Sequence, residues 1–161
     1  MQAHALEAQA SPIFQTITVN YDQSLETMIV AGHYDWRNDD ITAKRFAPKG
    51  EGVVEYEAKL FHFDRNLSSE QAVEAIKSAD TTNPWEPGKI EHLLSFGAKY
   101  PEEQRKYPII GLGSVAEVDG DRDVPCLYRS GAERLLDLIW WDGGWGGSCR
   151  FLAVRQLSSG S

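Results

Sequence analysis

Alternating apolar and polar residues predict two strands in the first half of the chain. Residues 13–21 place Ile17 and Val19 on one side of an extended chain and polar residues on the other, a period of two that is typical of a half-buried strand. Residues 53–64 are rich in β-branched and aromatic side chains and predict a second strand.

Residues that favour the start of a helix occur both before and after the second predicted strand. Ser24 is a good N-cap for a short helix over residues 25–31. Ser68 and Gln71 have the spacing of a capping box, which predicts a second helix that continues to about residue 79. Both helices are therefore expected to begin at a serine.

A third helix is expected over residues 89–99, after the breakers Pro84, Pro87 and Gly88. Its apolar positions recur at helical spacing and give one packed face: Ile90, Leu93, Leu94 and Gly97. Residues 33–52 carry turn-forming side chains instead and are expected to form a loop.

The last third of the chain changes to short strands. These are predicted over residues 109–115, 124–128, 135–141 and 150–154, and the links between them carry Asp, Ser and Gly residues typical of hairpin turns. N-terminal strands and helices followed by a short antiparallel β meander predict an α+β fold. We expect a single domain over residues 13–157, with a flexible leader at 1–12 and a flexible tail at 158–161.

Composition and charge narrow the possible partners. The net charge is −8 and no run of five basic residues occurs, so nucleic acid is not expected as a partner. No apolar run is long enough to cross a membrane, and the first residues lack the pattern of a secretion signal. A cytoplasmic protein is expected, or one exported by a route that needs no cleaved leader.

Two cysteines, Cys126 and Cys149, lack the spacing of a zinc site. Two small buried or half-buried thiols are favoured over a disulfide. We expect no cofactor.

The most unusual segment, residues 140–151, contains three tryptophans and four glycines. Glycine is unfavourable inside helices and strands, whereas tryptophan supplies large contact area, so the segment predicts an aromatic-rimmed loop before the last strand. Alternation from Leu135 places Trp140 in the core and Trp141 on the surface, next to Asp142. An exposed tryptophan beside a glycine loop favours a binding surface.

Two His-x-Asp triplets are the main candidates for catalysis. His33 and Asp35, with His62 and Asp64, would form a metal site or a general acid–base pair if both triplets converged. The alternative is that Phe61 and Phe63 face the core while His62 and Asp64 lie in solvent, which is the default pattern of a strand.

Two other motifs are weaker. The Gly111-Leu112-Gly113-Ser114 segment matches no phosphate-binding fingerprint, and its glycines are expected to admit a bulky neighbour such as a tryptophan. Asp119, Asp121 and Asp123 alternate in a loop but lack the other ligands of an EF-hand, so a solvated acidic turn is favoured over a calcium site.

A longer segment carries a family resemblance. Residues 85–94, the Trp- and Gly-rich turn and the ending Cys149-Arg150-Phe151-Leu152-Ala153-Val154-Arg155 lie within residues 68–155, which resemble the C-type-lectin fold of bacterial proteins. The ending is also similar to that of variable proteins diversified by retroelements. No Glu-Pro-Asn-like or Gln-Pro-Asp-like triplet of the calcium-dependent sugar-binding lectins is present.

The resemblance implies a C-type-lectin-like scaffold that includes Trp145, Arg150 and Phe151. It implies ligand-facing roles for Tyr128, Arg129, Trp141, Asp142, Gly143, Gly144 and Ser148. The expected function is non-enzymatic binding of a protein or other macromolecular ligand through this diversified surface. Two alternatives stay open: an enzyme that uses the His33/Asp35 and His62/Asp64 pairs, and a small acidic inhibitor or immunity-type protein with a basic partner.

Overall fold

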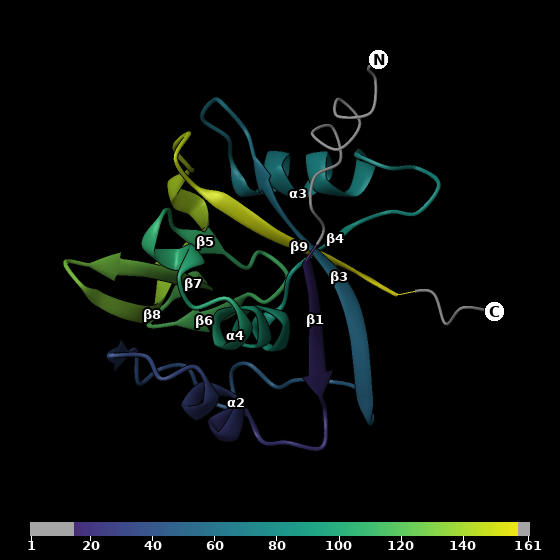
Figure 1. The fold of residues 1–161 in the computed structure, drawn as a ribbon. Coiled ribbons are helices and arrows are strands. Elements are labelled where there is room, and N and C mark those ends of the chain that lie inside the picture. The colour runs from purple at the N-terminus through teal and green to yellow at the C-terminus, as the bar shows by residue number, and fades with distance from the viewer. Residues whose placement is uncertain (1–14, 158–161) are drawn as a thin grey trace, which may run out of the picture.

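The computed structural model describes residues 15–157, and the strands of this part form one mixed nine-stranded sheet (Figure 1). The strand order is β1-β3-β9-β5-β7-β8-β2, while β4 pairs with β9 and β6 pairs with β7 outside this path. The strands are β1 (Gln15–Asn20), β2 (Trp36–Arg37), β3 (Val53–His62), β4 (Glu86–Pro87), β5 (Ile109–Ile110), β6 (Ala116–Val118), β7 (Asp121–Ser130), β8 (Glu133–Trp140) and β9 (Arg150–Gln156).

Three α-helices accompany the sheet, and all three were predicted. They are α2 (Leu25–Ala31), α3 (Ser69–Ser78) and α4 (Ile90–Lys99). The Ser24 hydroxyl accepts from the backbone N–H of Thr27, and Ser68 forms the predicted capping box with Gln71. Two 3-10 helices, η1 (Glu103–Arg105) and η2 (Trp141–Gly143), complete the list.

The sheet separates two hydrophobic clusters. Helices α2 and α4 pack on one face, where Ile29 and Leu93 join Leu127 and Leu152 of the sheet. Helix α3 lies on the other face, where Ile76 joins a cluster with Phe151 and Trp145. Figure 1 shows α3 on one side of the long strands and α4 with α2 on the other. Each face of the sheet therefore has its own core.

A buried arginine ties the two helices of the first face together. The Arg134 guanidinium donates to the carbonyl oxygens of Gly32, at the end of α2, and Gly97, near the end of α4. It also donates to the carbonyl of Pro101 and lies over the ring of Tyr34. Because the last carbonyls of a helix have no partner within it, this one side chain satisfies two helix ends.

The predicted C-type-lectin-like α+β fold is wrong. Strand makes up 36% of the described residues and helix 23%, so the sheet dominates. The C-terminal strands do not form a separate meander, because β9 leaves it and lies between β3 and β5. The pairs β5–β9 and β2–β8 are parallel. Alternation along a strand predicts which side chains are buried but not which strand is the neighbour, and the neighbours decide this fold.

None of the helices in the described part of the chain is long and apolar enough to span a membrane. The predicted leader, residues 1–12, and tail, residues 158–161, lie outside the described residues.

Candidate binding surface and groove

The loop between β8 and β9 is held firmly at its middle. Trp145 is only 4% exposed, and its backbone exchanges two hydrogen bonds with that of Leu67, before α3. Its ring packs edge-on against Phe151 at a centroid distance of 5.8 Å. Trp145 and Phe151, the residues given an implied scaffold role, are therefore both buried in the core.

Ser69, the first residue of α3, anchors this loop to the helix by two hydrogen bonds. Its hydroxyl donates to the carbonyl oxygen of Trp141 at 2.7 Å and accepts from the indole N–H of Trp145 at 2.8 Å. Ser69 is 1% exposed. A buried hydroxyl that both donates and accepts fixes the two tryptophans relative to α3.

The predicted roles of the first two tryptophans are reversed. Trp140 is 51% exposed, whereas Trp141 is half-buried, packs against the cluster beneath α3 and donates from its indole N–H to Glu70. Strand β8 ends at Trp140 and η2 begins at Trp141, so the period of two no longer applies to Trp141. Trp140 lies on the Leu136 side of the strand by alternation, but unlike Leu136 it does not join the hydrophobic cluster on that face.

The neighbours of Trp140 form an exposed patch. Asp142, Gly143 and Gly144 are exposed, and a Cβ on Gly143 would stand 3.4 Å from the Trp140 ring. Gly144 has a φ of 77°, a backbone conformation that favours glycine. We call Trp140, Asp142, Gly143 and Gly144 the Trp140 surface.

Acidic groups surround the Trp140 surface. Asp123 stands opposite Trp140 across the β7–β8 pair. Burial raises the pKa of Asp123, and the negative charges of Asp121 and Asp119 raise it further. One cation balances part of this charge: Arg122 pairs with Asp142 and lies over the ring of Trp141. The predicted acidic turn is thus part of the surroundings of this surface.

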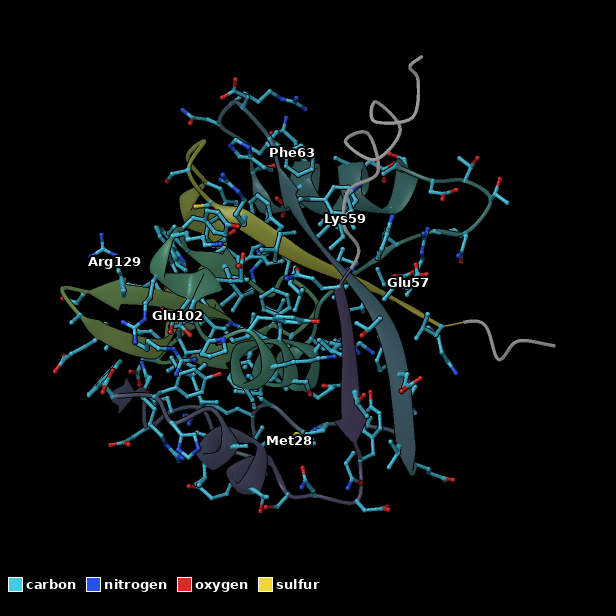
Figure 2. The ribbon with its side chains drawn as sticks, in the orientation of Figure 1. Met28, Glu57, Lys59, Phe63, Glu102 and Arg129 are labelled. Atoms are coloured by element: carbon cyan, nitrogen blue, oxygen red, sulfur yellow. The ribbon has the colours of Figure 1, made fainter. Side chains whose placement is uncertain are left out.

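Two of the predicted ligand-facing residues, Tyr128 and Arg129, lie at the other end of the hairpin. Arg129 stands six positions after Asp123, which is opposite Trp140, and six positions correspond to about 20 Å along a strand. Figure 2 shows Arg129 near Glu102.

Both residues also have internal partners. The Tyr128 hydroxyl donates to Asp137 at 2.9 Å, and burial together with this carboxylate raises the pKa of Tyr128 to about 12. Arg129 donates to the carbonyls of Arg105 and Gly131. The structure therefore keeps Trp141, Asp142, Gly143 and Gly144 together without Tyr128 and Arg129. Ser148, which is exposed, is also separate from them, because it precedes Arg150, which is level with Leu127 through Ile109. The third implied scaffold residue, Arg150, is half-buried and stacks on Tyr107 at 4.2 Å.

A groove of about 770 Å³ opens beside β4 and the end of β9, and Trp141 forms part of its wall. We call this hollow the β4 groove. Its lining combines aromatic, basic and small residues from both halves of the chain: Tyr21, Lys49, Tyr56, Val73, Lys77, Asn83, Pro84, Glu86, Pro87, Lys89, His92, Leu112, Gly113, Trp141, Val154, Arg155 and Gln156.

One wall of the β4 groove contains a buried histidine. His92 is 4% exposed, and its Nδ1 accepts from the backbone N–H of Lys89 at 2.9 Å. Burial and, to a smaller extent, the positive charge of Lys89 lower the pKa of His92 to about 3. The neutral ring therefore carries its proton on Nε2, which has no partner among the described residues.

The two His-x-Asp triplets take separate structural roles. His62 Nε2 donates to the carbonyl oxygen of Gly147 at 2.7 Å, and Asp64 is exposed. Asp35 accepts from the backbone N–H of Arg134 at 2.7 Å, while His33 is exposed with a φ of 52°. The described residues contain no group of three or more His, Cys, Asp or Glu placed to hold a metal ion.

Phe61 is buried and Phe63 half-buried, as the default strand pattern predicts. His62 and Asp64 lie on the exposed side of the same segment.

The two glycines of the Gly-x-Gly segment do admit a close neighbour, but it is backbone and not a tryptophan. Gly113 donates to the carbonyl of Gly88 at 2.7 Å, and a Cβ at position 113 would collide with the carbonyls of Pro87 and Gly88. The predicted strand over residues 109–115 accordingly ends at Ile110. Ser114, beyond it, caps α4 by accepting from the backbone N–H of Ile90.

Both cysteines are free thiols, Cys126 buried and Cys149 half-buried. Burial raises the pKa of both thiols. The prediction of two unpaired thiols is confirmed.

Sequence reasoning missed Ser69, whose partners Trp141 and Trp145 lie far along the chain, and His92, whose hydrogen-bond partner Lys89 is close in sequence. Ser69 carried one available signal, its place in the first turn of a predicted helix. His92 carried another, because it stands three residues after Lys89 at the start of a helix, where a side chain can reach back to the backbone.

Comparison with protein-family models, with curated protein sequences and with solved structures finds no match for this chain. The resemblance to variable proteins diversified by retroelements therefore stays a prediction.

Proposed function

We propose that this protein binds a macromolecular ligand, a protein with a basic surface, through the Trp140 surface. The observation that carries the proposal is Trp140 itself, a large aromatic side chain that is half exposed at the end of a strand. Tryptophan is among the residues that contribute most binding energy at protein interfaces.

The anchoring of the surrounding loop supports this proposal. Trp145, Ser69 and Leu67 hold the loop on both sides of the exposed residues. A surface that is already ordered loses less conformational entropy when a ligand binds. The glycines beside Trp140 leave its ring uncovered by neighbouring side chains.

The charge around the surface supports a basic ligand. Asp119, Asp121 and Asp123 add to Asp142 close to Trp140, and the whole chain carries a net charge of −8. Complementary charge raises the rate of association and excludes acidic partners. The alternative function, a small acidic inhibitor or immunity-type protein, also predicts that the protein binds a basic partner.

A random peptide library displayed on phage tests this function. We expect the protein to enrich basic peptides that contain apolar anchors. Trp140→Ala should weaken their binding about 30-fold, because loss of a central aromatic anchor costs about 2 kcal/mol.

Trp36→Ala is the matched control, since Trp36 is 47% exposed and lies on β2 at the edge of the sheet. It should leave peptide affinity within about twofold, as expected for a residue outside the interface. Failure to enrich any peptide, or equal losses in the two variants, would contradict the proposal.

A further inference from the structure

Basic side chains gather around the β4 groove and a smaller hollow next to it. The second hollow shares Lys49, Lys89 and Gly113 with the groove and adds Lys44 and Arg45. The two hollows together are lined by six basic residues, Lys44, Arg45, Lys49, Lys77, Lys89 and Arg155, and by two acidic ones, Glu86 and Glu91. This is the reverse of the whole chain, whose net charge is −8.

The lysines and the arginines of this region differ in their partners. Arg155 pairs with Glu57, labelled on β3 in Figure 2, and with Asp80, while Arg45 pairs with Asp40. The four lysines of the two hollows have no ion-pair partner within residues 15–157; they are Lys44, Lys49, Lys77 and Lys89. Their ammonium groups are therefore not engaged in direct ion pairs with carboxylates of the described residues.

Lys89 occupies an unfavourable place for a cation. It is the N-cap of α4, where the helix dipole is already positive and where Ser, Thr, Asp or Asn is preferred. The capping is done by other groups, since Ser114 accepts from Ile90 and His92 accepts from Lys89. A position that breaks a local rule while its neighbours compensate is typical of a functional site.

His92 adds an independent observation. It lines the same groove, it is 4% exposed, and its Nε2–H donor has no partner in the described part of the chain. Buried donors are nearly always satisfied in folded proteins, so this one is an exception within the wall of the groove.

We propose that the β4 groove binds a small phosphorylated molecule, held by Lys49, Lys77 and Lys89, with His92 as a neutral donor. Lysine binds phosphate as a compact point charge, whereas a planar carboxylate favours a guanidinium. The guanidinium of Arg155 in the groove is already engaged by carboxylates.

The size and lining of the groove fit such a ligand. Its volume of about 770 Å³ falls within the range of small-molecule sites and exceeds the needs of a phosphate group alone. Tyr21 and Tyr56, whose hydroxyls lie 2.8 Å apart, and the ring of Trp141 supply aromatic surface for an organic part.

Inorganic pyrophosphate serves as the test ligand for the part of the β4 groove that is proposed to hold phosphate groups. We expect saturable binding by calorimetry that weakens as salt increases. The imidazole ¹⁵N resonance of His92 Nε2 should shift during the titration, because Nε2–H gains an acceptor.

The double variant Lys77→Gln/Lys89→Gln should bind pyrophosphate at least about tenfold more weakly, since a hydrogen bond to a charged group contributes at least that factor. The control, Lys99→Gln/Lys106→Gln, makes the same change in net charge at lysines outside both hollows. It should change the affinity less than about twofold, and thermal unfolding checks that both variants fold.

Three results would overturn the proposal: no saturable binding of pyrophosphate, equal losses in the two double variants, or an unshifted His92 resonance at saturation. Citrate at the same ionic strength separates phosphate from carboxylate chemistry. Tighter binding of citrate than of pyrophosphate would also overturn the phosphate assignment.

Discussion

At the scale of single residues, His92 shows how burial sets chemical character. The ring lies against the edge of Tyr56 at a centroid distance of 4.5 Å and accepts from the backbone of Lys89. Taking a charged imidazolium out of water is costly, and the nearby ammonium of Lys89 adds repulsion. His92 is therefore neutral in the folded protein between about pH 3 and pH 6.5, where the unfolded chain protonates it.

This difference predicts a pH-dependent stability. Between pH 6.5 and about 3, the unfolded chain binds a proton at His92 and the folded chain does not. The free energy of unfolding should fall by about 1.4 kcal/mol for each pH unit below 6.5. His92→Asn keeps an acceptor for the Lys89 N–H and removes the titration.

Urea unfolding at several pH values measures the effect. The stability of the wild type relative to His92→Asn should decrease by about 3 kcal/mol between pH 6.5 and pH 4. A difference between the two proteins that does not change with pH would show that His92 protonates equally in both states.

At the scale of elements, the start of α3 and the β8–β9 loop form one unit. The capping box at Ser68 fixes the first turn of the helix, and Ser69, the next residue, binds both Trp141 and Trp145. The position of the Trp140 surface therefore depends on a helix that lies more than 60 residues earlier in the chain.

Ser69→Ala should lower the free energy of unfolding by about 1–3 kcal/mol, because it leaves the indole N–H of Trp145 buried without a partner. Ser78→Ala, the same change at an exposed position of α3, should alter stability by less than about 0.5 kcal/mol. Urea unfolding compares the two. Similar values for both variants would mean that Ser69 does not anchor the loop.

At the scale of the whole molecule, β9 joins the two halves of the sheet. It pairs with β3 on one side and with β5 and β4 on the other. Phe151, Leu152, Ala153 and Val154 are all buried and contribute to both hydrophobic clusters. Neither half of the sheet has a complete core without this strand.

A chain that stops at Ser148 should therefore lose cooperative unfolding altogether. Removal of β9 exposes two strand edges and the apolar surfaces on both faces of the sheet. A synthetic peptide of residues 149–157 added in trans should restore a cooperative transition, monitored by tryptophan fluorescence. A native-like transition in the shortened chain alone would show that β9 is dispensable.

The sequence alone determined the local structure of this protein. Helices α2, α3 and α4 follow from Ser24, from the Ser68–Gln71 box and from the spacing of Ile90, Leu93 and Leu94. These signals lie within a few residues of the structure that they specify, so no knowledge of the fold is needed. The exposure of His62 and Asp64 was predicted correctly as well.

The tertiary structure alone decided how these elements combine. It placed β9 between β3 and β5, reversed the exposure of Trp140 and Trp141, and brought Lys77, Lys89 and His92 to one groove. The physical reason is the same in each case. Strand pairing, burial at the end of a strand and convergence of charges depend on contacts between residues far apart in the chain, and hydrophobic periodicity carries no information about such partners.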